Sequence, residues 1–180
     1  MTVPYAAPLR ALHWTTAGLV LALFAIGWAI DFTSAAATRK LLLTVHQSIG
    51  LLVVLLAVSR LFLRSRLGVP RPVQGLPRWM DLLSRATHAA FYLLMVALPL
   101  SGWFYTGAKG GTVRFFWLVR LPRLSPADDG WADFAFEVHE LVGFALLFLI
   151  GAHVAAALYH HFVRGDETLR RMMPLSPRLS

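Results

Sequence analysis

The sequence contains no cysteine. Without thiols the chain cannot form disulfides, ligate an iron–sulfur cluster through thiolates, or attach a c-type haem covalently. Charge is also scarce, because charged residues make up 14% of the chain and hydrophobic residues 57%. A soluble domain of this size would carry a larger share of charge, so the composition predicts an integral membrane protein.

Four apolar stretches are each long enough to cross about 30 Å of hydrocarbon, which takes roughly 20 helical residues. They cover residues 9–30, 41–63, 80–104 and 137–163. Since little chain remains outside them, we expect an all-α fold in which residues 1–180 form one integral membrane four-helix bundle. The first stretch runs the full length of a span and lacks the short apolar core of a cleavable signal, so we expect it to be retained as the first helix.

Basic residues are concentrated in the segment between the second and third stretches and in the tail. By the positive-inside rule these two segments are cytoplasmic, so both termini are cytoplasmic and residues 31–40 and 105–136 lie outside. Binding of nucleic acid is rejected, because charges beside membrane spans fit the electrostatics of the inner leaflet better. The residues concerned are Arg64, Arg66, Arg71 and Arg78 between the two stretches, Arg60 and Arg85 at their adjoining ends, and Arg164, Arg170, Arg171 and Arg178 in the tail.

All seven histidines lie within the apolar stretches, and six of them are candidates for a functional role: His13, His46, His88, His139, His153 and His160. His46 and His139 lie near the outer surface, whereas His13 and His153 lie towards the inner surface. His139 and His153 are 14 residues apart, which is about 21 Å of helix and nearly four whole turns, so one helix offers ligands at two depths. The spacing predicts two bis-histidine haem sites in the bundle, His46 with His139 and His13 with His153.

Two other interpretations of these histidines are possible. A histidine in a membrane helix can simply be hydrogen-bonded to a neighbouring backbone carbonyl, which would make the protein structural. A metal-handling protein would need acidic or thiol partners beside the histidines, but Glu140 is the only carboxylate adjoining one of them in the sequence. Four histidines at matched depths favour haem over both interpretations.

Several strings resemble the bacterial cytochrome b561 family over nearly the whole chain. The strings are His13-Trp14, His46 with Gly50 and Arg60, HAAFYLLMVALPLSG (88–102), His139-Glu140 with Gly143, HVAAALYHH (153–161) and LRRMMP (169–174). The resemblance implies a multi-pass protein of the bacterial inner membrane that binds two haem b groups. It also implies His13 and His153 as ligands of the inner haem and His46 and His139 as ligands of the outer haem, which agrees with the pairing from depth.

Within this family the resemblance implies a superoxide:ubiquinone oxidoreductase. Superoxide would deliver electrons on the periplasmic side and leave as dioxygen, and ubiquinone would be reduced near the cytoplasmic side. His88 and His160 both lie near the cytoplasmic surface, where histidines can donate hydrogen bonds and protons to a quinone head-group. No catalytic residue is expected beyond the haems.

A small anion such as superoxide needs a positive surface on the outer side. The candidates for steering it are Arg39, Lys40, Lys109 and Arg114, with Arg120 and Arg123 further along the outer connection. In that connection the aromatic run 115–119 is expected to lie at the membrane interface, as a lid or an anchor. Besides lipid, superoxide and ubiquinone, no obligatory protein partner is expected.

Two alternative functions remain at the level of the sequence. The chain could be a cytochrome b membrane anchor that passes electrons between a periplasmic dehydrogenase or hydrogenase and quinone. It could also be a structural or metal-handling membrane protein without a redox role. A periplasmic partner would distinguish the first alternative, and a colourless purified protein would distinguish the second.

Overall fold

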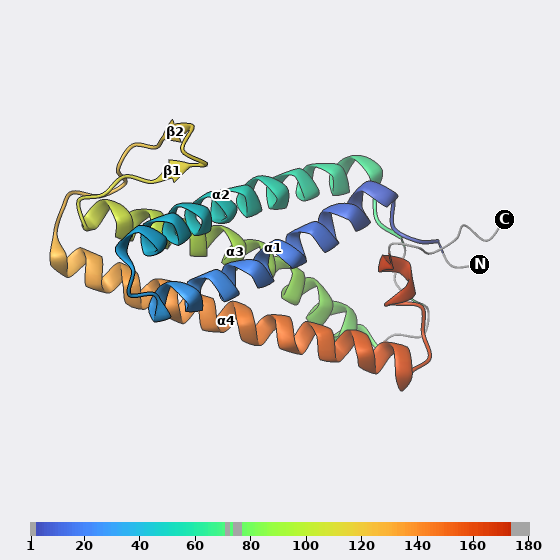
Figure 1. Cartoon of the computed structure of the whole chain (residues 1–180). Helices are drawn as coiled ribbons and strands as arrows, with labels where there is room; N and C mark the ends of the chain where they lie inside the picture. Colours follow the sequence, from blue (N-terminus) through green and yellow to red (C-terminus); the bar gives the residue numbers. More distant parts are fainter. Residues whose placement is uncertain (1–2, 71–72, 74–76, 174–180) are drawn as a thin grey trace.

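The computed structural model describes residues 3–70, 73 and 77–173 and shows an antiparallel four-helix bundle with a small β-hairpin at one end (Figure 1). Arg71, Arg178 and Pro174 of the LRRMMP string lie outside the described residues. The elements are α1 (Ala7–Phe32), α2 (Ala36–Leu67), α3 (Arg78–Ala108), β1 (Arg114–Phe115), β2 (Val119–Arg120), α4 (Asp129–Phe162) and the 3-10 helix η1 (Arg170–Met172).

All four α-helices are long and apolar enough to cross a membrane. Their outward faces carry large apolar side chains such as Leu93, Leu141 and Phe148, which are 69%, 71% and 78% exposed. Exposed apolar surface on this scale would be unfavourable in water but is stable against lipid. The expectation of four membrane-spanning helices is therefore supported by the fold.

The helices extend beyond the predicted spans, and the outer connection is correspondingly shorter than the expected 105–136. Helix α3 continues to Ala108, and α4 begins at Asp129, eight residues before the predicted start at 137. The Asp128 side chain caps α4 by accepting a hydrogen bond from the backbone N–H of Trp131 at 2.9 Å. Hydropathy detects only the part of a helix that matches hydrocarbon, so it missed these polar ends.

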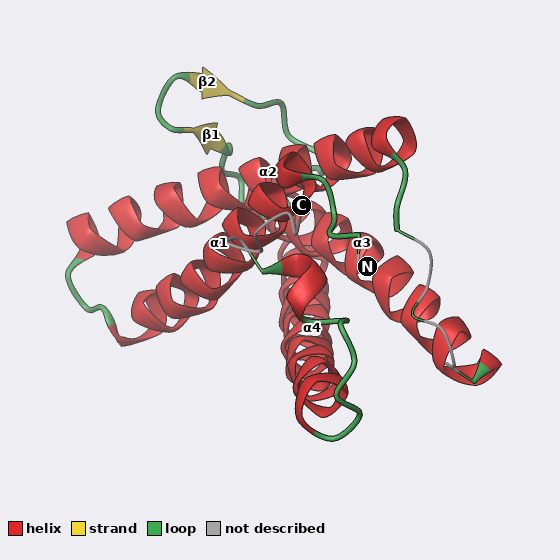
Figure 2. Ribbon diagram, turned by 90° about the vertical axis from the view of Figure 1, so that its right-hand side faces the viewer, coloured by secondary structure: helices red, strands yellow, loops and turns green. Residues whose placement is uncertain are grey.

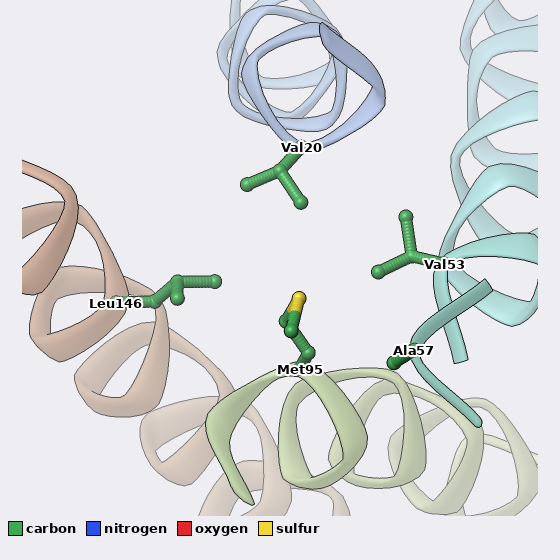
Figure 3. Packing of buried hydrophobic residues seen from close by; sticks show 5 residues of the cluster. All are labelled: Val20, Val53, Ala57, Met95 and Leu146. Atoms are coloured by element: carbon green, nitrogen blue, oxygen red, sulfur yellow. The ribbon is translucent and has the colours of Figure 1, made fainter. Parts of the chain in front are cut away.

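The helices pack in the order α1, α2, α3 and α4, while the backbones of α1 and α4 hardly approach each other in the described part. One buried cluster with side chains from all four helices fills the middle of the bundle (Figure 3). It consists of Val20, Val53, Ala57, Met95 and Leu146. Leu146 lies seven residues from both His139 and His153, so this apolar layer separates the two expected haem levels.

The two ends of the bundle are closed differently. At one end the hairpin β1–β2 lies beside α2 (Figure 2). At the other end, η1 folds back under α1, where the Trp14 indole donates a hydrogen bond to the carbonyl of Met172 at 2.8 Å. The backbone N–H of Tyr5 also bonds the carbonyl of Arg171, which brings the two ends of the described chain together.

Candidate functional site

The outer pair of histidines meets across the interior of the bundle. The ring centres of His46 on α2 and His139 on α4 are 6.3 Å apart. The Nδ1 atom of His139 lies 3.1 Å from the carbonyl oxygen of Leu98, which makes Nδ1 the protonated nitrogen and leaves Nε2 with a free lone pair. The Nδ1 atom of His46 is buried and has no hydrogen-bond partner among the described residues.

Glycines stand directly against both of these rings. A Cβ atom added to Gly102 would lie 3.1 Å from Cε1 of His139, which is closer than side chains normally tolerate. A Cβ atom added to Gly27 would lie 3.7 Å from Cε1 of His46, at ordinary contact distance. The space beside His139 therefore depends on the absence of a side chain at position 102.

The inner pair has the same separation as the outer pair. The ring centres of His13 on α1 and His153 on α4 are 6.3 Å apart. Phe91 packs edge-on against His153 with ring centres 5.3 Å apart, and His88 lies next to the same ring at 5.9 Å. His153 is thus the centre of a small aromatic cluster formed by α1, α3 and α4.

The separation of both pairs fits one metal ion held between two imidazoles. A metal–imidazole bond of about 2 Å, added to about 1.1 Å from nitrogen to ring centre on each side, places two coordinating rings about 6.2 Å apart. In the described part of the chain, no three histidine, aspartate or glutamate side chains gather in a way that could hold a metal ion. The donor set is therefore two imidazoles per site, which suits a metal whose other ligands come from a porphyrin.

His88, one of the two expected quinone contacts, lies at the inner histidine pair. Its Nδ1 atom donates to the carbonyl of Ser84 at 2.6 Å, which leaves its Nε2 lone pair free. The ring centres of His88 and His153 are 5.9 Å apart, which is also close to the separation of two imidazoles on one metal ion. Ring separation alone therefore fits either His13 or His88 as the partner of His153. The equal separations of the His13 and His46 pairs favour His13.

His160, the other expected quinone contact, is engaged with the segment that follows α4. Its Nδ1 atom bonds Oδ2 of Asp166, and Arg164 lies 3.4 Å from the same oxygen. Burial by itself would raise the pKa of the Asp166 carboxyl, but hydrogen bonds from His160 and Thr168 outweigh burial and lower that pKa to about 2. No contact in the described part of the chain joins His160 to His88.

The expected steering residues fall into two groups. Lys40 and Arg114 line a cavity of about 290 Å³ between α2 and the hairpin, with Thr44, Gln47 and Trp117 among the other lining residues. Neither cation has a hydrogen-bond or ion-pair partner in the described part of the chain.

Arg39 and Lys109 lie outside that cavity and are already engaged. The guanidinium of Arg39 donates to the carbonyl of Ile30 at 3.0 Å. Lys109 pairs with Asp129 at 3.0 Å and Asp133 at 3.5 Å, and the hydrogen bond with Asp129 raises the pKa of its amine. The structure therefore brings Lys40 and Arg114 together, but not Lys109.

Two hydrogen bonds lead from the cavity lining to the glycine that lies against the outer histidine pair. The amide of Gln47 donates to the hydroxyl of Thr106 at 3.1 Å, and that hydroxyl donates to the carbonyl of Gly102 at 2.9 Å. Gly102 in turn lies against the His139 ring. Sequence reasoning gave Gln47 and Thr106 no role, because their meeting depends on the packing of α2 against α3.

A family model and two known proteins match almost the whole chain. The family model for prokaryotic cytochrome b561 matches residues 4–175. Cytochrome b561 homolog 2 of Escherichia coli (strain K12) is 31% identical over 164 residues, which cover 91% of this chain and 87% of the relative. The probable superoxide oxidase CybB of Yersinia pestis is 33% identical over 167 residues, which cover 91% of this chain and 92% of the relative.

Proposed function

Because this chain belongs to the prokaryotic cytochrome b561 family, a family of haem b membrane proteins that transfer electrons, we propose that it oxidises superoxide and reduces ubiquinone. We further propose that residues 1–180 form one domain of the bacterial inner membrane with both termini cytoplasmic. The observation that carries this proposal is the pair of equal 6.3 Å separations, one at each level of the bundle.

The four ligand histidines would hold one haem b at each level. His46 and His139 would hold the outer group, and His13 and His153 the inner group, all as neutral imidazoles. When bound, haem supplies one-electron oxidation and reduction at two depths of the membrane. His139 and His153 are about 21 Å apart along α4, so electron transfer between the two sites would cross much of the hydrocarbon.

At the outer level, Lys40 and Arg114 would attract superoxide to the cavity beside α2. Each superoxide anion loses one electron and leaves as dioxygen, so no protein group has to form or break a bond. Two unpaired cations at the mouth of a cavity raise the local concentration of a small anion and its rate of arrival. The similarity to the probable superoxide oxidase of Yersinia pestis supports this choice of electron donor.

At the inner level, His88 and His160 would contact ubiquinone. Reduction to ubiquinol takes two electrons and two protons, so a group that can hold and release protons must lie near the head-group. Asp166 orients His160 through Nδ1, so Nε2 would donate to a quinone carbonyl when it carries a proton and would accept from the ubiquinol hydroxyl when it does not. His88 is oriented in the same way by the carbonyl of Ser84.

The activity is tested by supplying detergent-purified protein with a steady flux of superoxide and ubiquinone and measuring ubiquinol. One ubiquinol is expected for every two superoxide anions consumed. Reversing both cavity charges, Lys40→Glu with Arg114→Glu, should slow ubiquinol formation at least about tenfold at low ionic strength and weaken its salt dependence. The paired cation provides the matched control, since Lys109→Glu should change the rate little.

The second candidate is a membrane anchor that receives electrons from a periplasmic dehydrogenase or hydrogenase. The observation in its favour is the tip of the hairpin, where Trp117, Leu118 and Val119 are 54%, 82% and 52% exposed. A protein partner could cover this apolar tip, as could lipid. A haem-loaded protein that superoxide leaves oxidised, but a dehydrogenase reduces, would favour this candidate.

A further inference from the structure

Arg60 is a charged residue within α2, one of the helices that can span the membrane, and it is half-buried inside the bundle. It has no hydrogen bond or ion pair with any described residue. An arginine inside a membrane domain is costly unless its charge is paired, so an unpaired one indicates a missing anion.

Arg60 lies at the level of the inner histidine pair. Gly27 of α1 faces His46 of α2, and moving 14 residues along these antiparallel helices from that contact reaches His13 on one and Arg60 on the other. The charge of Arg60 is close enough to act on His13, on His153 and on the neighbouring His88. The cation therefore lies beside the proposed inner haem.

A second donor without a partner lies within electrostatic reach of Arg60. It is the hydroxyl of Tyr92 on α3, which is buried with no hydrogen-bond partner in the described part of the chain. A buried hydroxyl that forms no hydrogen bond costs about 1 to 3 kcal/mol. A guanidinium and a phenol together form a donor set that suits a carboxylate.

The described acidic residues nearest this end of the bundle cannot supply that carboxylate, because each is already engaged by a cation. The pairs are Asp81 with Arg85, Asp166 with His160 and Arg164, and Glu167 with Arg170. Among the described residues, no unengaged carboxylate near this end matches Arg60 and Tyr92, which points to an anion supplied by a bound molecule.

We propose that Arg60 and Tyr92 bind a propionate carboxylate of the inner haem and so fix its rotation between His13 and His153. This inference rests on the proposed function, since it needs a haem at that level. Haem b carries ionised propionates on one edge of the ring, and an arginine binds a carboxylate through two parallel hydrogen bonds. Arg60 is thus a positioning residue, not a ligand of the iron.

The inference is tested by the rate at which haem leaves the protein. In Arg60→Gln the inner haem should transfer to excess apomyoglobin at least about tenfold faster than in the wild type, while the outer haem should leave at an unchanged rate. Arg60→Lys should restore part of the loss, and Tyr92→Phe should give a smaller loss. Arg66, an exposed arginine on the same helix, provides the matched control as Arg66→Gln.

Haem dimethyl ester separates a propionate contact from other roles of Arg60. The ester has no carboxylate, so Arg60→Gln should release it no faster than the wild type does. If Arg60→Gln speeds release of haem and of its ester equally, the residue acts on the fold and the proposal is wrong. If it changes neither release rate but removes a tightly bound anionic lipid, a lipid phosphate is the partner and the proposal is wrong as well.

The midpoint potentials give a second readout. Loss of the Arg60 cation should lower the midpoint potential of the inner haem by about 59 mV, which is about a tenfold change in the equilibrium constant for its one-electron reduction. The midpoint potential of the outer haem should stay unchanged. Unchanged potentials in a protein that binds two haems would overturn this inference alone. A wild-type protein that binds no haem would overturn the proposed function instead.

Discussion

At the scale of single residues, the least conspicuous residue at the outer pair is Gly102. The Gly102→Ala variant should lower the content of outer haem, because the new methyl group would come within 3.1 Å of the His139 ring. Gly18→Ala is the matched control, since nothing lies within 4 Å of the added methyl group. Haem per protein, measured by pyridine haemochrome, should fall in the first variant only, and equal haem content in both would contradict the role of Gly102.

Asp166 is the residue whose effect depends on pH. Its lowered pKa means that the carboxylate stabilises the folded segment at pH values above its ordinary pKa of about 4, and that this contribution disappears as pH falls from about 4 to about 2. Asp166→Asn should therefore speed amide hydrogen exchange of Thr168, whose N–H bonds Asp166 at 2.9 Å, by about tenfold at neutral pH.

The comparison of the two proteins below pH 2 provides the check. Below pH 2, the exchange rate of the Thr168 amide in the wild type, corrected for intrinsic exchange, should approach the rate in the variant, because the Asp166 carboxylate is then protonated. A difference of the same size at pH 7 and below pH 2 would show that the charge of Asp166 does not hold this segment.

At the scale of elements, the hairpin depends on one buried serine. The hydroxyl of Ser48 accepts a hydrogen bond from the N–H of Phe116 at 2.8 Å and lies 3.2 Å from the carbonyl of Arg114. Phe116 and Trp117 have φ angles of 43° and 63°, a conformation that costs non-glycine residues about 1 to 2 kcal/mol each. Contacts with α2 must offset that strain.

Ser48→Ala should release the hairpin from α2. Loss of the hydroxyl leaves the N–H of Phe116 without its partner, which should cost about 1 to 3 kcal/mol locally. Limited proteolysis near Trp117 should then become faster than in Ser59→Ala, where the lost hydrogen bond is an exposed one within α2. Equal cleavage rates in the two variants would mean that Ser48 does not hold the hairpin.

The same elements show how far sequence could predict the fold. The four long helices followed from hydropathy because hydrocarbon selects for about 20 apolar residues in a row. The hairpin did not follow, because Phe116 and Trp117 replace the Asn-Gly or Gly-rich pair that normally indicates such a turn. Its conformation depends on Ser48, which is 66 residues away from Arg114 in sequence.

Some features of the candidate site could likewise be predicted from the sequence, and others could not. The pairing of His13 with His153 and of His46 with His139 could be proposed from the sequence, because helical rise converts residue number into position along a helix, and the structure brings the rings of each pair to 6.3 Å. The family resemblance seen in the sequence is confirmed by the match over residues 4–175. The partners of Asp166, the contact of Gly102 with the His139 ring and the burial of the Tyr92 hydroxyl could not be predicted, because each depends on which side chains of other segments pack nearby.

At the scale of the whole molecule, the histidines should behave as two independent pairs. His46→Ala and His139→Ala should each remove only the outer haem, while His13→Ala and His153→Ala should each remove only the inner haem. His88→Ala should retain both haems, which distinguishes it from His13 as the partner of His153. Redox titration of each variant shows which haem is missing, and loss of the inner haem in His88→Ala with its retention in His13→Ala would reverse the assignment.

The most direct test of the central claim is rapid mixing of the oxidised, haem-loaded protein with superoxide, followed at the absorption band of reduced haem b. Fast reduction of the haem is expected, and then reoxidation with formation of ubiquinol when ubiquinone is present. A protein that binds both haems but stays oxidised in the presence of superoxide would contradict the claim that superoxide is its electron donor.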